Sequence, residues 1–164
     1  MSTTSRGGSR RRVPLPRRPL VRTPHTYDYA VLRVVPRVER GEFINAGVVL
    51  WCAGARFLGV QLALDEAVLQ ALDPEVDLPQ LHAALTAIDH VCRGGESAGA
   101  LGRLPARDRF HWLVAQRSTI IQTSPVHTGY CHDPQQALER LTNTMVRRRS
   151  GGPGQALSVD GSCG

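Results

Sequence analysis

The fold is decided by residues 46–62, which read AGVVLWCAGARFLGVQL. The first part, from Ala46 to Cys52, is apolar on both faces of an extended chain, which is typical of a strand inside a sheet. Gly54 favours a turn, and the segment from Arg56 to Leu62 returns as a second strand. This stretch therefore predicts a β-hairpin near the centre of a sheet.

On the N-terminal side of the hairpin, a further strand is expected over residues 27–35. This segment, YDYAVLRVV, is rich in aromatic and β-branched residues, and Pro36 ends it. A polar connector over residues 37–45 then leads into the hairpin. The N-terminal half of the folded chain is therefore predicted to be three consecutive strands.

On the C-terminal side, the chain becomes mainly helical. Asp65 is the expected N-cap of a short helix that ends at Leu72, and Asp133 with Pro134 is the expected start of a last helix that ends near Arg148. Between them, apolar residues at helical spacing predict helices over about 78–92 and 105–116. Residues 94–103 are expected to form a small-residue loop, and residues 118–123 a fourth strand.

The predicted order is β-β-β-α-α-α-β-α. Because strands and helices are segregated, we expect an α+β fold, with a mainly antiparallel sheet of about four strands and three to four helices packed on one face. The 164 residues fit one domain. The expected division is a disordered Arg- and Pro-rich arm at 1–24, a single domain at 25–148 and a disordered Gly- and Ser-rich tail at 149–164.

The charge is distributed unevenly along the chain. The net charge is +6, yet residues 25–146 carry ten Arg against thirteen acids, whereas residues 1–24 carry seven Arg and no acid. The folded part is therefore mildly acidic, and any affinity for nucleic acid is expected to come from the arm. The sequence contains no Lys, which excludes a Schiff-base lysine and a phosphate-binding P-loop lysine.

Composition also indicates the compartment. No apolar run approaches the length that spans a bilayer, and the N-terminus lacks the apolar stretch of a secretory signal. The four cysteines show no C-x-x-C spacing, so reduced thiols in a cytoplasmic protein are the expected state. No membrane contact, cofactor or metal is expected.

Three groups of segments resemble a known family. They are residues 27–36, the stretch RGEFINAGV at 40–48, and the stretch from Phe110 through the QTSPVHTG of residues 122–129. Together they are similar to the bacterial family called domain of unknown function 3037, over about residues 25–147. The resemblance implies a bacterial, intracellular protein of one domain. It brings no assigned activity, cofactor or catalytic residue.

Polar side chains near the first and fourth strands form the best candidate site. Arg33 shares a strand face with Tyr27, Tyr29 and Val31, and an Arg on such a face needs a carboxylate or an anionic ligand. A second polar set, around the expected fourth strand, consists of Arg117, Gln122, Ser124 and His127. If the fourth strand pairs with the first, this set and Arg33 could share one pocket. The candidate ligand-binding residues are Arg33, Arg40, Asn45, Arg117, Gln122, Ser124 and His127.

Glu42 and His127 are the candidate catalytic groups, as an acid–base carboxylate and a neutral-pH base. There are two alternative interpretations. Glu42 could be a solvated residue of a connector that neutralises its own charge, and Arg33 could form an internal salt bridge. Two other motifs are set aside. Residues 95–99 match G-x-S-x-G but lack the strand that a nucleophile elbow needs before its Ser. His127, Cys131 and His132 lack a fourth ligand for structural zinc.

Two classes of function remain open at this level. The leading one is a small non-catalytic binding or adaptor domain, with a protein partner or an anionic ligand. The alternative is a small enzyme or enzyme subunit that acts on an anionic substrate through Arg33, Glu42, Arg117 and His127. Non-specific binding of nucleic acid through residues 1–24 is a further alternative.

Overall fold

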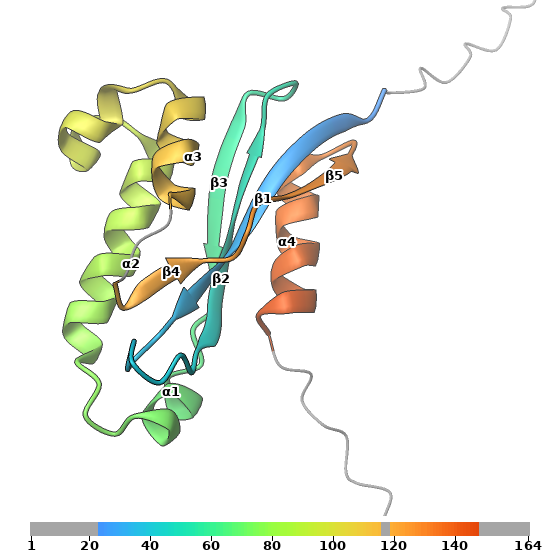
Figure 1. The fold of residues 1–164 in the computed structure, drawn as a ribbon. Helices are drawn as coiled ribbons and strands as arrows, with labels where there is room; N and C mark the ends of the chain where they lie inside the picture. Colours follow the sequence, from blue (N-terminus) through green and yellow to red (C-terminus); the bar gives the residue numbers. More distant parts are fainter. Residues whose placement is uncertain (1–22, 116–118, 148–164) are drawn as a thin grey trace, which may run out of the picture.

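The computed structural model describes residues 23–115 and 119–147, and its core is a five-stranded antiparallel sheet. The strands are β1 (His25–Val34), β2 (Ile44–Cys52), β3 (Phe57–Leu62), β4 (Ile121–Thr123) and β5 (His127–Cys131). Their order is β3-β2-β1-β4, and β5 also pairs with β1 (Figure 1). The α+β class is confirmed, and the hairpin supplies one inner strand, β2, and one edge strand, β3.

The fifth strand was not expected from the sequence. β1 has ten residues and takes two partners on the same edge. Its first half, His25–Tyr29, pairs with β5, and its second half, Leu32–Val34, pairs with β4. Ser124 lies where the partner changes: its backbone N–H donates to the carbonyl of Val31 at 2.9 Å, and its hydroxyl accepts from the N–H of Val31 at 2.9 Å.

The described helices are α1 (Glu66–Leu72), α2 (Leu78–Arg93), the 3-10 helix η1 (Glu96–Arg103), α3 (Ala106–Val114) and α4 (Pro134–Met145). Three of the five described helices, α1, α2 and α4, begin after an aspartate that caps them. The carboxylate of Asp65 accepts from the N–H of Val68 at 3.1 Å, and that of Asp133 accepts from the N–H of Gln135 at 2.9 Å. Such caps satisfy backbone donors that a helix start leaves free. η1 replaces the loop expected at 94–103.

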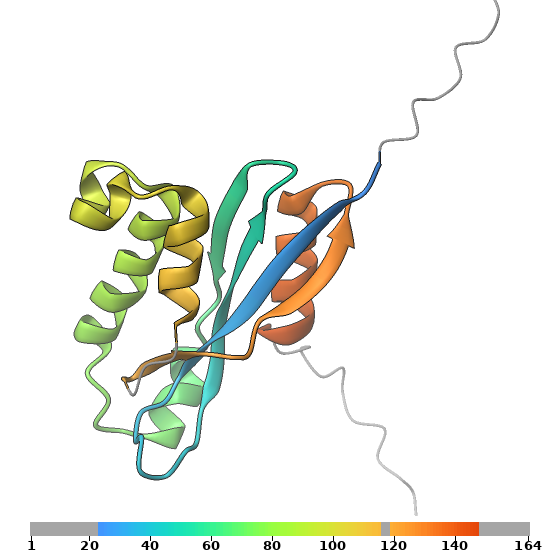
Figure 2. The same cartoon turned by 45° about the horizontal axis from the view of Figure 1, so that its top comes forward.

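Helices cover both faces of the sheet, rather than one as the sequence suggested. On one face, Leu138 and Leu141 of α4 pack against Tyr27, Val48 and Leu50. On the other face, α2 and α3 cover a second apolar cluster, which includes Ala30, Leu32, Val49, Val91 and Phe110. The views in Figures 1 and 2 agree that α4 lies on the opposite side of the sheet from α2 and α3. The physical reason is that β1 and β2 are apolar on both faces, and each face must be removed from water.

None of the helices in the described ranges is long and apolar enough to cross a membrane. The predicted tail and nearly all of the predicted arm lie outside the described residues.

Candidate functional site

An open, mostly apolar groove of about 460 Å³ lies between the sheet and the α2–α3 layer. We call it the α2–β4 groove. It is lined by Leu32, Ala84, Ala87, Ile88, His90, Val91, Ser97, Ala98, Leu101, Trp112, Leu113, Ala115, Thr119, Ile120, Ile121, Gln122 and Thr123. Its volume falls in the range of roughly 300–1,000 Å³ that is usual for small-molecule pockets.

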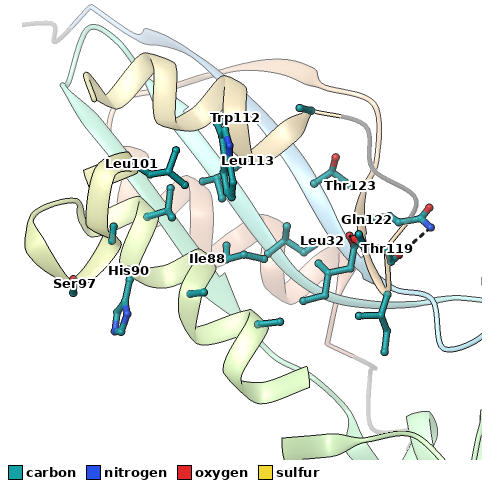
Figure 3. Close-up of a pocket in the computed structure, with 17 residues that line it drawn as sticks. Leu32, Ile88, His90, Ser97, Leu101, Trp112, Leu113, Thr119, Gln122 and Thr123 are labelled. Carbon is teal, nitrogen blue, oxygen red and sulfur yellow. Dashed lines mark hydrogen bonds between the residues drawn. The ribbon is translucent and has the colours of Figure 1, made fainter. Parts of the chain in front are cut away.

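Different elements supply the sides of the groove (Figure 3). Ile88 comes from α2, Trp112 and Leu113 come from α3, and Leu32 comes from the sheet. At one end the groove meets Leu101 and Ser97 of η1, and at the other end it meets Thr119, Gln122 and Thr123 beside β4. The groove therefore extends from η1 to β4 and is partly open to solvent.

Arg109 holds the two helical walls together. Its Nη1 donates to the carbonyl oxygens of Val91 at 2.6 Å and Cys92 at 2.7 Å, in the last turn of α2. Its Nε donates to the carbonyl of Leu104 at 3.1 Å, just before α3. A guanidinium at a helix C-terminus satisfies orphan carbonyls and interacts favourably with the helix dipole. The spacing of α2 and α3 is thus fixed by a charged hydrogen-bond clamp as well as by packing.

The chemistry of the groove is neutral and largely apolar. Among the lining residues that the structure describes there is no carboxylate, guanidinium or thiol, and the polar groups include the side chains of His90, Ser97, Thr119, Gln122 and Thr123. Gln122 Nε2 already donates to the carbonyl of Thr119 at 3.1 Å, and Thr123 Oγ1 donates to the carbonyl of Val114 at 3.3 Å. The described lining residues therefore offer an ionic ligand hydrogen bonds but no carboxylate or guanidinium of opposite charge.

Part of the predicted polar site does come together, on the face that α4 covers. The expected pairing of the fourth strand with the first is confirmed, and Arg33 lies directly between Asn45 of β2 and Gln122 of β4. Residues directly opposite each other on antiparallel strands project from the same face. The structure therefore aligns three of the predicted residues in one row across the sheet.

Ser124 and His127 have other surroundings. Ser124 is buried, and both its hydroxyl and its backbone N–H bond to the backbone around the β4–β5 junction. His127 lies opposite Tyr29, with 5.4 Å between the two ring centroids. Tyr29 is four residues from Arg33 along β1, which corresponds to about 13 Å. His127 is therefore far from the row that contains Arg33.

The acidic candidate Glu42 is paired locally. Its Oε1 lies 2.7 Å from Nη2 of Arg40, and both side chains are exposed to solvent. Arg37, in the same connector, contacts Asp73 at 3.3 Å and Glu75 at 3.4 Å. Both arginines of the connector are thus paired with carboxylates, Arg40 within the connector and Arg37 outside it. Arg117, the remaining candidate, lies outside the described residues.

Two thiols of the described domain, those of Cys92 and Cys131, are poorly suited to nucleophilic chemistry. Burial raises the pKa of Cys92 to about 12. Burial also raises the pKa of Cys131, with a further contribution from the neighbouring Cys52. Since the thiolate is the nucleophile, both groups are unreactive at neutral pH. Within the described residues, no three His, Cys, Asp or Glu side chains are placed to hold a metal ion.

The α2–β4 groove was missed at the level of sequence. Its apolar residues on α2 and α3, such as Ile88 and Leu113, repeat at helical spacing, and this pattern predicts a core face. The pattern does not say that the helices stand apart from β4. The run of small residues from Ala98 to Gly102 was visible, but it predicts a loop as readily as the end of a groove.

Comparison with known proteins returns one family. The model of the family described as "Protein of unknown function (DUF3037)" matches residues 29–146. No curated protein matches the chain, and no solved structure does.

Proposed function

The chain belongs to the DUF3037 family, whose description names no activity, and from the geometry we propose that it is a non-catalytic binding domain that holds a small, neutral, largely apolar molecule in the α2–β4 groove. The observation that carries this proposal is the groove itself, which has a volume of about 460 Å³ and whose described lining residues include no carboxylate or guanidinium.

The choice of a small molecule rests on shape and polarity. Small-molecule sites are concave and mostly apolar, and a few polar groups fix the orientation of the ligand. In the groove, polar side chains lie at the two ends, while the middle is formed by Leu32, Ile88 and Leu113. A ligand with an apolar body and a hydroxyl or carbonyl group at one end would match this arrangement.

The proposal that the domain is non-catalytic rests on the side chains that line the groove. Acid–base or nucleophilic catalysis needs a reactive group within hydrogen-bond reach of a partner that activates it. His90 and Ser97 line the groove, but no hydrogen bond between them exists in the described structure, and Ser97 is exposed. The enzyme alternative needs Arg33, Glu42 and His127 in one pocket, and these three residues are dispersed among different partners.

The experiment uses the neutral fluorescent probe N-phenyl-1-naphthylamine and the full chain. Ala87 is an exposed residue of α2 that lines the groove, so Ala87→Phe places a ring in the groove without overfilling the core. Thr86→Phe is the matched control, because Thr86 is also exposed on α2 but does not line the groove. We expect saturable binding that weakens at least about tenfold in Ala87→Phe, a loss of about 1.4 kcal/mol, and is unchanged in Thr86→Phe.

Equal binding by both variants and the parent chain would refute the proposal. Size-exclusion chromatography of the same three proteins tests a different occupant. A dimer that dissociates only in Ala87→Phe would assign the groove to a second copy of the chain and would also overturn the small-molecule proposal.

A further inference from the structure

Arg33 carries a charge that no described carboxylate neutralises. It lies on the α4 face of β1, and its guanidinium carbon is 4.4 Å from the centre of the Phe43 ring. The ion pairs of the described residues involve Arg37, Arg40, His82 and Arg93, and none involves Arg33. Its Nε is buried and has no hydrogen-bond acceptor. A half-buried cation in this state is costly unless an anion pairs with it.

Asn45, directly across the strand pair from Arg33, carries a second unsatisfied atom. Its Nδ2 donates to the carbonyl of Met145 at the end of α4, at 2.8 Å, which fixes the orientation of the amide. Its Oδ1 is buried and accepts no hydrogen bond in the described structure. A donor without an acceptor and an acceptor without a donor thus lie on one face of two adjacent strands.

A cavity of about 280 Å³ adjoins these residues. It is lined by Phe43, Ile44, Asn45, Asp65, Val68, Met145, Val146 and Arg147. Phe43 is 47 % exposed, so its ring can rotate away without breaking a packed core. Phe43 and Asn45 both lie next to Arg33, Phe43 through its ring and Asn45 as the residue opposite on β2. Movement of the Phe43 ring would open the cavity towards the guanidinium of Arg33.

We propose that Arg33, Phe43 and Asn45 form a binding site for a small monocarboxylate that carries a hydrogen-bond donor next to its carboxyl group. The planar guanidinium binds a carboxylate with two parallel hydrogen bonds, and Phe43 holds it by stacking. The donor of the ligand, a hydroxyl or an ammonium group, bonds to Oδ1 of Asn45.

The charges around the cavity select a monoanion. Arg147 and Asp65 line the cavity with opposite charges. Arg33, which lies against the Phe43 ring beside the cavity, adds one positive charge, so these three side chains leave one net positive charge. Nη1 of Arg147 is already bonded to Oδ1 of Asn143 at 2.8 Å, and Oδ1 of Asp65 caps α1. A phosphate dianion would lie near the carboxylate of Asp65, and only the guanidinium of Arg33 would be free to pair with it. We therefore expect phosphate to bind more weakly than a monocarboxylate.

This site is distinct from the α2–β4 groove. Arg33 and Asn45 lie on the α4 face of the sheet, and the groove lies on the α2–α3 face. Gln122 borders both, because it lines the end of the groove and lies opposite Arg33. If the probe does not bind in the groove, the proposal of a carboxylate site is unaffected. If glycolate does not bind near Arg33, the proposal for the groove is unaffected.

The test is NMR of the Arg Nε–Hε signals of the full chain, with Arg33→Lys to assign the signal of Arg33. Sodium glycolate, sodium acetate and sodium phosphate are titrated at constant ionic strength and pH. Glycolate carries the hydroxyl donor and acetate lacks it. We expect a saturable shift of the Arg33 signal, with glycolate binding about threefold to tenfold more tightly than acetate, as one added hydrogen bond predicts, and phosphate binding most weakly.

Two variants sharpen the test. Gln122→Glu places a carboxylate directly opposite Arg33, and we expect it to compete with glycolate and weaken its binding at least about tenfold. Arg40→Gln is the matched control, because Arg40 lies in the neighbouring connector and pairs with Glu42, and it should bind glycolate as the parent does. Backbone amide spectra verify the fold of each variant. The proposal is overturned if the Arg33 signal does not saturate below about 100 mM glycolate, or if Gln122→Glu binds glycolate as tightly as the parent chain.

Discussion

Ser124→Ala tests the junction at which β1 changes partner. The hydroxyl of Ser124 accepts a hydrogen bond of 2.9 Å from the N–H of Val31 and donates one of 2.8 Å to the carbonyl of Pro125. Ser124 is 3 % exposed and Val31 is 7 % exposed. The substitution removes the acceptor and leaves the N–H of Val31 buried and unpaired.

The expected loss of unfolding free energy is about 1–3 kcal/mol, which is the cost of a buried polar group without its partner. The second bond between these residues, from the backbone N–H of Ser124 to the carbonyl of Val31, remains in the variant. The loss should therefore be confined to one donor and should not extend to the whole junction. Thr144→Ala is the control, because the hydroxyl of Thr144 is exposed on α4 and bonds only to the carbonyl of Arg140 among the described residues. It should change the stability by less than about 0.5 kcal/mol.

Urea unfolding of the three proteins measures these differences from midpoints and slopes. Amide hydrogen exchange adds a local observable, since the N–H of Val31 should lose protection in Ser124→Ala more than its neighbours in β1 do. If Ser124→Ala lies within about 0.5 kcal/mol of the parent and Val31 keeps its protection, the hydroxyl does not stabilise the junction and the argument fails.

Three further predictions use the same urea assay. Arg109→Met should cost about 1.5–3 kcal/mol, because three carbonyls lose a charged donor, and a cost below 0.5 kcal/mol would show that packing alone holds α2 to α3. Gly47→Ala should cost about 1–3 kcal/mol, since its Cβ would lie 2.7 Å from the carbonyl oxygen of Gln61; an unchanged midpoint would contradict this. The raised pKa of Cys92, about 12 against an ordinary 9.0, means that the unfolded thiol ionises first, so stability should fall from pH 9 upwards. In Cys92→Ala the free energy of unfolding should fall less steeply with pH, by the contribution of one titrating proton. Identical slopes of the free energy of unfolding against pH between about pH 9 and 11 in both proteins would refute the assignment.

Much of the local structure could be predicted from the sequence. The three N-terminal strands, the caps Asp65 and Asp133, and the helices on either side of residue 100 follow from signals within a few residues of one another. The alignment of Arg33 with Gln122 could also be predicted, because it requires only that the fourth strand pairs with the first. These features depend on backbone preference and on the period of apolar residues, and both are properties of neighbouring positions.

Tertiary structure decided the rest. His127–Cys131 is a strand because β1 is long enough to offer a second edge to it, and nothing in its own mixed composition requires this. The two-sided covering of the sheet and the α2–β4 groove depend on how far α2 and α3 stand from strands that lie far away in sequence. That Arg33 pairs with no carboxylate among the described residues is likewise a property of the folded chain. Contacts between distant segments determine whether a charged side chain pairs with one of opposite charge. A sequence pattern specifies which residues face the core, but it does not specify which of them contact each other.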